Sequence, residues 1–173
     1  MSSAPPPLWL LKFTWSTAGE AMTAALQGRA DAVLCRALDA DLGHAYLHDT
    51  ASPGAGWLPL HPLLHLRGAA AGGDARYHYV VETDVLPEQE ADFNDWYDTE
   101  HLPGLAAVPG TVHAARYRCD TASPRYYACY DLADRATFGS PDWLAVRGTA
   151  WSSRVRPAFR HTRRTMFERV ALE

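Results

Sequence analysis

The order of strand-like and helix-like patterns in the second half of the chain constrains its fold most. Short runs rich in β-branched and aromatic residues predict strands at 77–85, 112–119, 125–131 and 161–170. A helix is predicted from Pro87 to about His101, because a proline and then acidic residues favour a first helical turn and Pro103 cannot continue a helix. A broken helical region follows at 134–153. The order is therefore β-α-β-β-α-β, in which two helices pack on one face of an antiparallel sheet.

This is the order of a ferredoxin-like unit, and the first half repeats it in reduced form. Strands are predicted at 8–15, 32–38, 43–48 and 57–66, with one helix at 18–27 and a loop at 49–56 in place of a second helix. Pro59 and Pro62 favour an edge strand for the last of these. The predicted fold class is α+β, with two ferredoxin-like units of which the first is degenerate.

The sequence also predicts where the two units meet. Residues 1–7 form a short tail, 8–67 the degenerate half, 68–75 a flexible linker rich in Gly and Ala, and 76–173 the complete half. The pentapeptide Asp-Thr-Ala-Ser-Pro occurs at 49–53, after a predicted hairpin, and again at 120–124, inside one. Either the match is accidental or the first half is shifted by one element relative to the second.

Composition and length narrow the class of protein. A chain of 173 residues that is 47% hydrophobic and 11% aromatic folds around a packed core. No apolar run approaches the roughly 20 residues of a membrane span, and the N-terminus lacks the features of a secretory signal. Three cysteines without CxxC spacing indicate reduced thiols. We therefore expect a cytoplasmic protein that does not bind membranes, and the net charge of −4 gives no reason to expect a nucleic-acid partner.

The charged residues are unevenly distributed. No Lys or Arg lies between Arg76 and Arg116, a stretch crowded with Asp and Glu, whereas the C-terminal part is rich in arginine. The arginines of that part are Arg147, Arg154, Arg156, Arg160, Arg163, Arg164 and Arg169. Two explanations remain open: oppositely charged faces that attract each other within the fold or across a dimer, or a basic patch that binds a ligand.

The run from Phe93 to Pro103 carries the most specific chemistry. On a helix, Phe93, Tyr97 and His101 lie on one stripe with Trp96 beside it, so an imidazole stands in the last turn and faces the sheet. Such a histidine can exchange protons near neutral pH. It can equally be a packing residue that caps helix carbonyls.

The pattern Phe-x-x-Trp-Tyr-x-x-x-His-x-Pro, after a strand and before the Pro109-Gly110 turn, resembles the EthD-like branch of the dimeric α/β-barrel superfamily. The resemblance covers about residues 76–170. It implies that two ferredoxin-like units pair their sheets into a barrel, usually across a dimer, with ligands between the sheet and the helices. Superfamily members include cofactor-free monooxygenases, polyketide cyclases and haem-handling enzymes, so the fold does not name the reaction. The first-half helix lacks the histidine, so only the second cleft is expected to be competent.

Other candidate residues lie on the predicted strands. His78 and Glu82 share one strand face, where they either contact a ligand or lie at an exposed end. Tyr127 is a core residue or a phenol that contacts substrate. Arg116 either stabilises an oxyanion or forms a salt bridge with the acidic helix.

These observations favour a small cofactor-independent enzyme that cyclises, dehydrates or isomerises a hydrophobic aromatic or polyketide-like carbonyl compound. His101 would be the general base or acid, Tyr97 and Arg116 would stabilise the oxyanion, and the substrate would contact a second set of residues: Phe93, Trp96, His78, Glu82 and Tyr127. We expect no cofactor and no metal, since no nucleotide, flavin or metal-binding motif occurs.

Three alternatives remain beside this hypothesis. The first is a cofactor-free monooxygenase of a phenolic substrate, and the second is a non-catalytic protein that binds a hydrophobic ligand or haem through His101. The third is a structural subunit whose cleft is filled with side chains, against which a pocket of about 300 Å³ or more would argue. The abundance of Trp and Tyr, with the opposed charges, also favours a homodimer.

Overall fold

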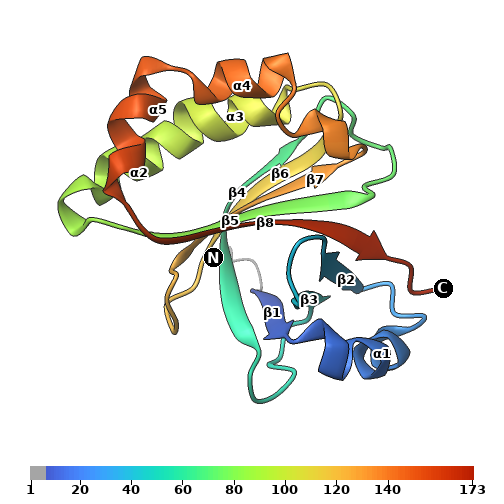
Figure 1. Ribbon diagram of the computed structural model, residues 1–173. Coiled ribbons are helices and arrows are strands. Elements are labelled where there is room, and N and C mark those ends of the chain that lie inside the picture. The colour runs from blue at the N-terminus through green and yellow to red at the C-terminus, as the bar shows by residue number, and fades with distance from the viewer. Residues whose placement is uncertain (1–6) are drawn as a thin grey trace, which may run out of the picture.

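The computed structural model describes residues 7–173 as a closed antiparallel barrel (Figure 1). The strand order around the barrel is β1-β3-β2-β8-β5-β7-β6-β4. The strands are β1 (Leu8–Phe13), β2 (Ala32–Ala37), β3 (Gly43–His48), β4 (Leu58–Arg67), β5 (Tyr77–Val85), β6 (Thr111–Arg118), β7 (Tyr126–Leu132) and β8 (Phe159–Val170). The helices are α1 (Trp15–Leu26), α2 (Glu90–Trp96), α3 (Leu102–Ala106), α4 (Pro141–Arg147) and α5 (Ala150–Val155). Short 3-10 or π turns are η1 (Pro87–Gln89), η2 (Tyr97–His101), η3 (Arg135–Thr137) and η4 (Arg156–Ala158).

The barrel consists of two ferredoxin-like units, as the sequence predicted. In each half the fourth strand pairs with the first, the first with the third and the third with the second: β4-β1-β3-β2 and β8-β5-β7-β6. The units join where β2 pairs with β8 and where β4 pairs with β6. The two copies of the repeated pentapeptide therefore occupy non-equivalent loops, one between the third and fourth strands of its half and one between the second and third.

The prediction that the 57–66 strand lies at an edge is wrong. Strand β4 pairs with β1 on one side and with β6 on the other, and so closes the barrel. Its prolines are tolerated because the register shifts between Pro62 and Leu64 and because pairing with β1 covers only Leu58–Leu60.

Helices cover the outside of the barrel unequally (Figure 1). The helices α2 to α5 pack over the outer face of the second-half sheet, where they bury an aromatic cluster around Phe93, Trp96 and Trp143. On the first half, α1 packs against β2 and β3. None of the helices in the described part of the chain is long and apolar enough to cross a membrane.

The Gly- and Ala-rich segment after β4 is held against the second half by backbone hydrogen bonds. The N–H of Gly68 donates to Val112 (2.8 Å), that of Ala69 to Ala106 (2.9 Å) and that of Ala70 to Thr111 (2.8 Å). A Cβ on Gly68 would lie 2.0 Å from the carbonyl oxygen of Thr111, so glycine permits this close approach. The predicted tail residues 1–6 lie outside the described range.

Candidate functional site

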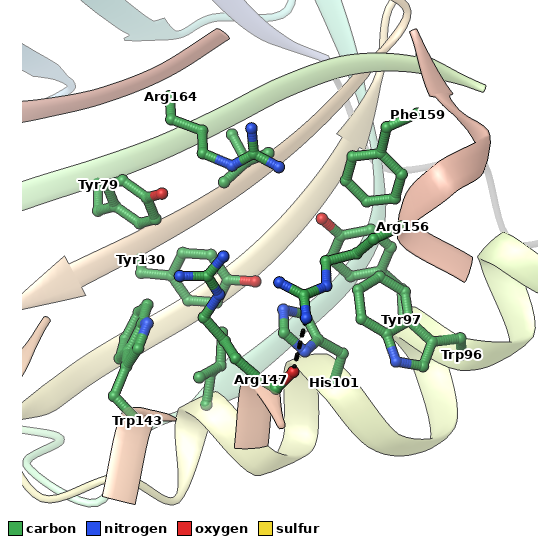
Figure 2. A pocket seen from close by; sticks show the side chains of 12 residues that line it. Tyr79, Trp96, Tyr97, His101, Tyr130, Trp143, Arg147, Arg156, Phe159 and Arg164 are labelled. Atoms are coloured by element: carbon green, nitrogen blue, oxygen red, sulfur yellow. Dashed lines mark hydrogen bonds between the residues drawn. The ribbon is translucent and has the colours of Figure 1, made fainter. Parts of the chain in front are cut away.

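A small cleft lies between the second-half sheet and its helices, beside His101 (Figure 2). Its walls are aromatic and aliphatic side chains, with three arginines, two tyrosines of the sheet and His101 among them. The lining residues are Tyr79, Val81, Trp96, Tyr97, His101, Leu105, Tyr130, Trp143, Arg147, Arg156, Phe159 and Arg164. The predicted residues His101, Tyr97 and Trp96 are thus brought together at one cavity.

A π turn places His101 in this wall. The helix that begins at Glu90 does not end at His101 as predicted, but continues through η2 into α3, up to Ala106. Within η2 the N–H of Leu102 donates to the carbonyl of Tyr97, five residues earlier. The wider turn makes room for the ring of Pro103, which a regular α-helix would exclude, and such turns often occur at functional sites.

His101 is buried and electrically neutral. Its side chain keeps 7% exposure and stacks on Trp96, with ring centroids 4.1 Å apart and an interplanar angle of 21°. Burial, and then the positive charges of Arg147, Arg156 and Arg116, lower the pKa of His101 to about 3. The prediction that this histidine exchanges protons near neutral pH is therefore wrong for the cleft as it stands, because burial outweighs the favourable position near a helix end. Its Nδ1 atom has no hydrogen-bond partner within residues 7–173. The uncharged imidazole can accept a proton or share a hydrogen bond, but at neutral pH it is no proton donor of the imidazolium type.

Phenol groups supply hydrogen-bond donors to the cleft. Burial raises the pKa of Tyr97 to about 12, so this phenol keeps its proton at neutral pH. Tyr130 is 1% exposed and its hydroxyl has no partner in the described residues, and Figure 2 shows that hydroxyl turned toward the cleft. A buried hydroxyl without a partner is energetically unfavourable, so the hydroxyl of Tyr130 is available to bond a polar atom of water or of a ligand.

The sequence interpretation missed three arginines of the cleft as site residues. Arg147 ends α4, Arg156 lies in η4 and Arg164 lies on β8 beside Val81 of β5. The uneven charge distribution was the signal, since a ligand-binding basic patch was one of its two explanations. The other explanation also applies, because Arg154 pairs with Asp92 and Arg125 pairs with Glu90 on the acidic helix.

Arg116 lies behind the cleft rather than in its lining. Its guanidinium, 1% exposed, bonds Asp98 at 2.9 Å and Asn94 at 2.8 Å, and stands 4.4 Å from the ring centre of Tyr97. Phe93 is also fully buried in this second layer and meets Tyr97 edge to face. Both residues hold Tyr97 in position.

The other predicted substrate contacts lie on the opposite face of the sheet, inside the barrel. His78 bonds Asp131 at 2.8 Å and the hydroxyl of Tyr46 at 2.9 Å. Glu82 pairs with Lys12, whose ammonium lies 5.0 Å from the ring centre of Tyr127. Because successive residues of a strand point to opposite faces, neither His78 nor Glu82 reaches the cleft that Tyr79 and Val81 line.

The cleft is narrow. The cavity has a volume of about 30 Å³, enough for about two water molecules, and all the space between its walls, open solvent included, is about 380 Å³. Side chains therefore fill most of it, and its volume is well short of the roughly 300 Å³ of a formed ligand pocket. In this form the cleft does not argue against the structural-subunit alternative, and a ring-sized ligand fits only if lining side chains move. Arg164 is exposed and Arg147 and Arg156 are half-buried, so a ligand would enter by displacing these long side chains.

Haem does not fit this site. His101 stacks against Trp96 at 4.1 Å, and the cavity beside it is far smaller than a macrocycle requires. Within residues 7–173, no group of three or more His, Cys, Asp or Glu side chains is arranged to hold a metal ion.

The comparisons with known proteins agree with the fold. No protein-family model matches the chain, and no curated protein matches it in sequence. Among solved structures, a monooxygenase-like protein of Fusobacterium nucleatum has a TM-score of 0.70 at 10% identity, over 98% of this chain and 94% of that one. A ferredoxin-fold protein of Listeria monocytogenes, related to antibiotic biosynthesis monooxygenases, has a TM-score of 0.63 at 11% identity, over 96% of each chain.

Two further structures extend the range of activities on this fold. An anthrone oxidase-like protein has a TM-score of 0.62 at 16% identity, over 99% of this chain and 94% of that one. A haem-degrading enzyme of Listeria monocytogenes has a TM-score of 0.59 at 10% identity, over 93% and 97%. At these identities the likeness establishes a ferredoxin-like fold with a closed barrel, and not a reaction.

Proposed function

We propose that the protein is a cofactor-independent enzyme in which His101 removes a proton from an enolisable aromatic or polyketide-like carbonyl compound. The observation that supports this most is a neutral imidazole in a π turn, with an unpaired Nδ1, at the wall of an aromatic cleft. A general base must be uncharged before it accepts a proton, and His101 is uncharged at neutral pH, but a pKa of about 3 also makes it a weak base. The proposal therefore requires that an anion bound at the cleft offsets the arginine charges and raises the pKa of His101.

The cleft also supports the anion that such a reaction creates. When the proton leaves the carbon next to a carbonyl, negative charge develops on the carbonyl oxygen as an enolate or phenolate. Arg147, Arg156 and Arg164 carry positive charge at the cleft, and the phenols of Tyr97 and Tyr130 can donate hydrogen bonds to that oxygen. The same negative charge favours the protonated form of His101, so the proton transfer and the charge stabilisation assist each other.

The fate of the enolate distinguishes two reactions. Return of the proton at another atom, ring closure or loss of water gives the isomerase, cyclase or dehydratase that the sequence predicts. Addition of O₂ to the electron-rich ring gives the monooxygenase alternative, and the monooxygenase-like and anthrone oxidase-like structures of this fold favour that second candidate. The helix motif of the EthD-like branch lies at this cleft, and we include membership of that branch in the proposal.

Anthrone is a suitable probe, because its methylene hydrogens are acidic and the enol form is a phenol. Without oxygen, in deuterated buffer, we expect enzyme-catalysed exchange of the methylene hydrogens, followed by NMR. With O₂, the monooxygenase alternative predicts anthraquinone: one oxygen atom becomes the new carbonyl and the other leaves as water with the two methylene hydrogens.

The variant His101→Ala decides the role of the histidine. As general base, its loss should lower the exchange rate by roughly 10²–10⁴ while the fold is retained. As a packing residue, its loss should lower stability by about 1–3 kcal/mol and leave exchange per folded molecule unchanged. Exchange at the rate of free buffer with the wild-type protein, for anthrone and for related hydroxylated anthrones, would refute the proposal.

A further inference from the structure

Three arginines of the cleft lack a negative partner. Arg147, Arg156 and Arg164 approach the same cavity from α4, η4 and β8, and Figure 2 shows all three at its mouth. None of them forms an ion pair with a carboxylate in the described part of the chain. The one contact between them is a hydrogen bond, from Nη2 of Arg156 to the backbone carbonyl of Arg147 at 3.1 Å.

This arrangement differs from that of two other arginines of the second half, Arg116 on β6 and Arg154 on α5. Arg116 pairs with Asp98 and Arg154 pairs with Asp92, each at 2.9 Å. Carboxylates are therefore available in this part of the chain. The acidic side chains that could have neutralised the cleft point elsewhere. The lining of the cleft holds three cations and no carboxylate.

The absence of a counter-charge has a physical cost. Burial, and then the positive charges of Arg147 and Arg164, lower the pKa of Arg156, so the other two guanidinium groups act on Arg156 as like charges. Like charges that are held together at a partly buried site destabilise the fold unless an anion joins them. A cluster of this kind is best explained as one half of an ion-pair arrangement whose other half is the ligand.

Two further groups point to a ligand with polar atoms. Tyr130 and His101 both line the cleft, and the hydroxyl of Tyr130 and Nδ1 of His101 are buried without a partner in residues 7–173. The remaining wall is aromatic, with Trp96 on one side and Trp143 on the other. A flat ring suits such walls, and a carboxylate suits the planar fork of guanidinium donors.

We infer that the cleft binds a substrate that is already an anion, namely an aromatic carboxylate whose ring lies against the aromatic wall of the cleft and whose carboxylate bonds the arginines. That this ligand is a substrate rests on the proposed function. The inference narrows the small hydrophobic ligand predicted from the sequence to an acidic one. Arg164 and Arg156 act as specificity residues, because they favour binding of an acid over binding of its neutral analogue. This discrimination occurs at the binding step, before any reaction.

A matched pair of probes tests this directly. The acid 1-hydroxy-2-naphthoate and the neutral amide 1-hydroxy-2-naphthamide have nearly the same shape, and isothermal titration calorimetry measures the affinity of each. We expect the acid to bind about tenfold tighter or more at low salt, as charge-assisted hydrogen bonds imply, and the advantage to shrink at high salt.

Variants locate the effect. Arg164→Gln and Arg156→Gln should each weaken binding of the acid about tenfold and leave binding of the amide unchanged. Arg163→Gln is the matched control, since it removes the same charge from the next residue of β8, which does not line the cleft. Its affinity for the acid should stay within about twofold of wild type.

Three results would overturn the inference: equal affinities for acid and amide, no binding of either, or an equal loss in Arg163→Gln. The result for the proposed function is separate, because it comes from deuterium exchange and from His101→Ala. Arginine-dependent binding without any deuterium exchange would support the acid-binding site and refute the proposed enzymatic function. Exchange of neutral anthrone with no preference for acids would support the enzymatic function and refute the acid-binding site.

Discussion

The buried neutral state of His101 makes the stability of the protein depend on pH in a defined direction. The pKa of this histidine falls from an ordinary value of 6.5 to about 3 in the folded chain. Below the ordinary value the unfolded chain binds a proton that the folded chain does not, so acid favours unfolding. The contribution of His101 is fully present above about pH 6.5 and is lost as the pH falls toward about 3.

The size of the effect follows from the shift. Each pH unit below the ordinary pKa costs roughly 1.4 kcal/mol, so about 3 kcal/mol is lost between neutral pH and about pH 4. The variant His101→Gln cannot take up this proton, and its free energy of unfolding should fall by about 3 kcal/mol less than that of wild type over the same range.

Urea unfolding, followed by tryptophan fluorescence at several pH values, measures this difference. His61→Gln is the control, because His61 is exposed and lies outside the cleft, so the variant should follow wild type at every pH. If His101→Gln and wild type lose the same free energy in acid, His101 is not buried in its neutral form, and its assignment as a general base loses its physical ground.

Three other predictions concern the layers around the cleft. Arg116→Met should lower the free energy of unfolding by about 2–4 kcal/mol, since it removes both bonds of a buried guanidinium. The control Arg125→Met, at the exposed surface, should lower it by under about 1 kcal/mol, and chemical denaturation measures both. Gly104→Ala would bring a Cβ to 2.8 Å from a stiff methyl of Val146, so we expect a loss of about 1–3 kcal/mol, and an unchanged melting temperature would contradict it. All three cysteines are buried, so Ellman's reagent should find no fast-reacting thiol in the native protein and three in denaturant; a fast thiol without denaturant would show that the barrel opens.

Local patterns along the chain determined much of this protein. The strand and helix order of the second half, the degenerate repeat in the first half and the stripe of Phe93, Tyr97 and His101 were all visible, because residues a few positions apart fix periodicity and face. The alternation along β5 likewise separated His78 and Glu82 from Tyr79, although it could not tell which face the helices cover.

Tertiary structure decided what depends on distant residues. Strand β4 is no edge, because β6 of the other half supplies its second partner. The helix passes Pro103, because hydrogen bonding shifts to a π turn that no local propensity reveals. Arg147, Arg156 and Arg164 meet at one cleft because α4, η4 and β8 fold over the same end of the sheet. Sequence spacing sets the face on which a side chain lies, while the charges and cavity that give it chemistry come from elements far apart in the chain.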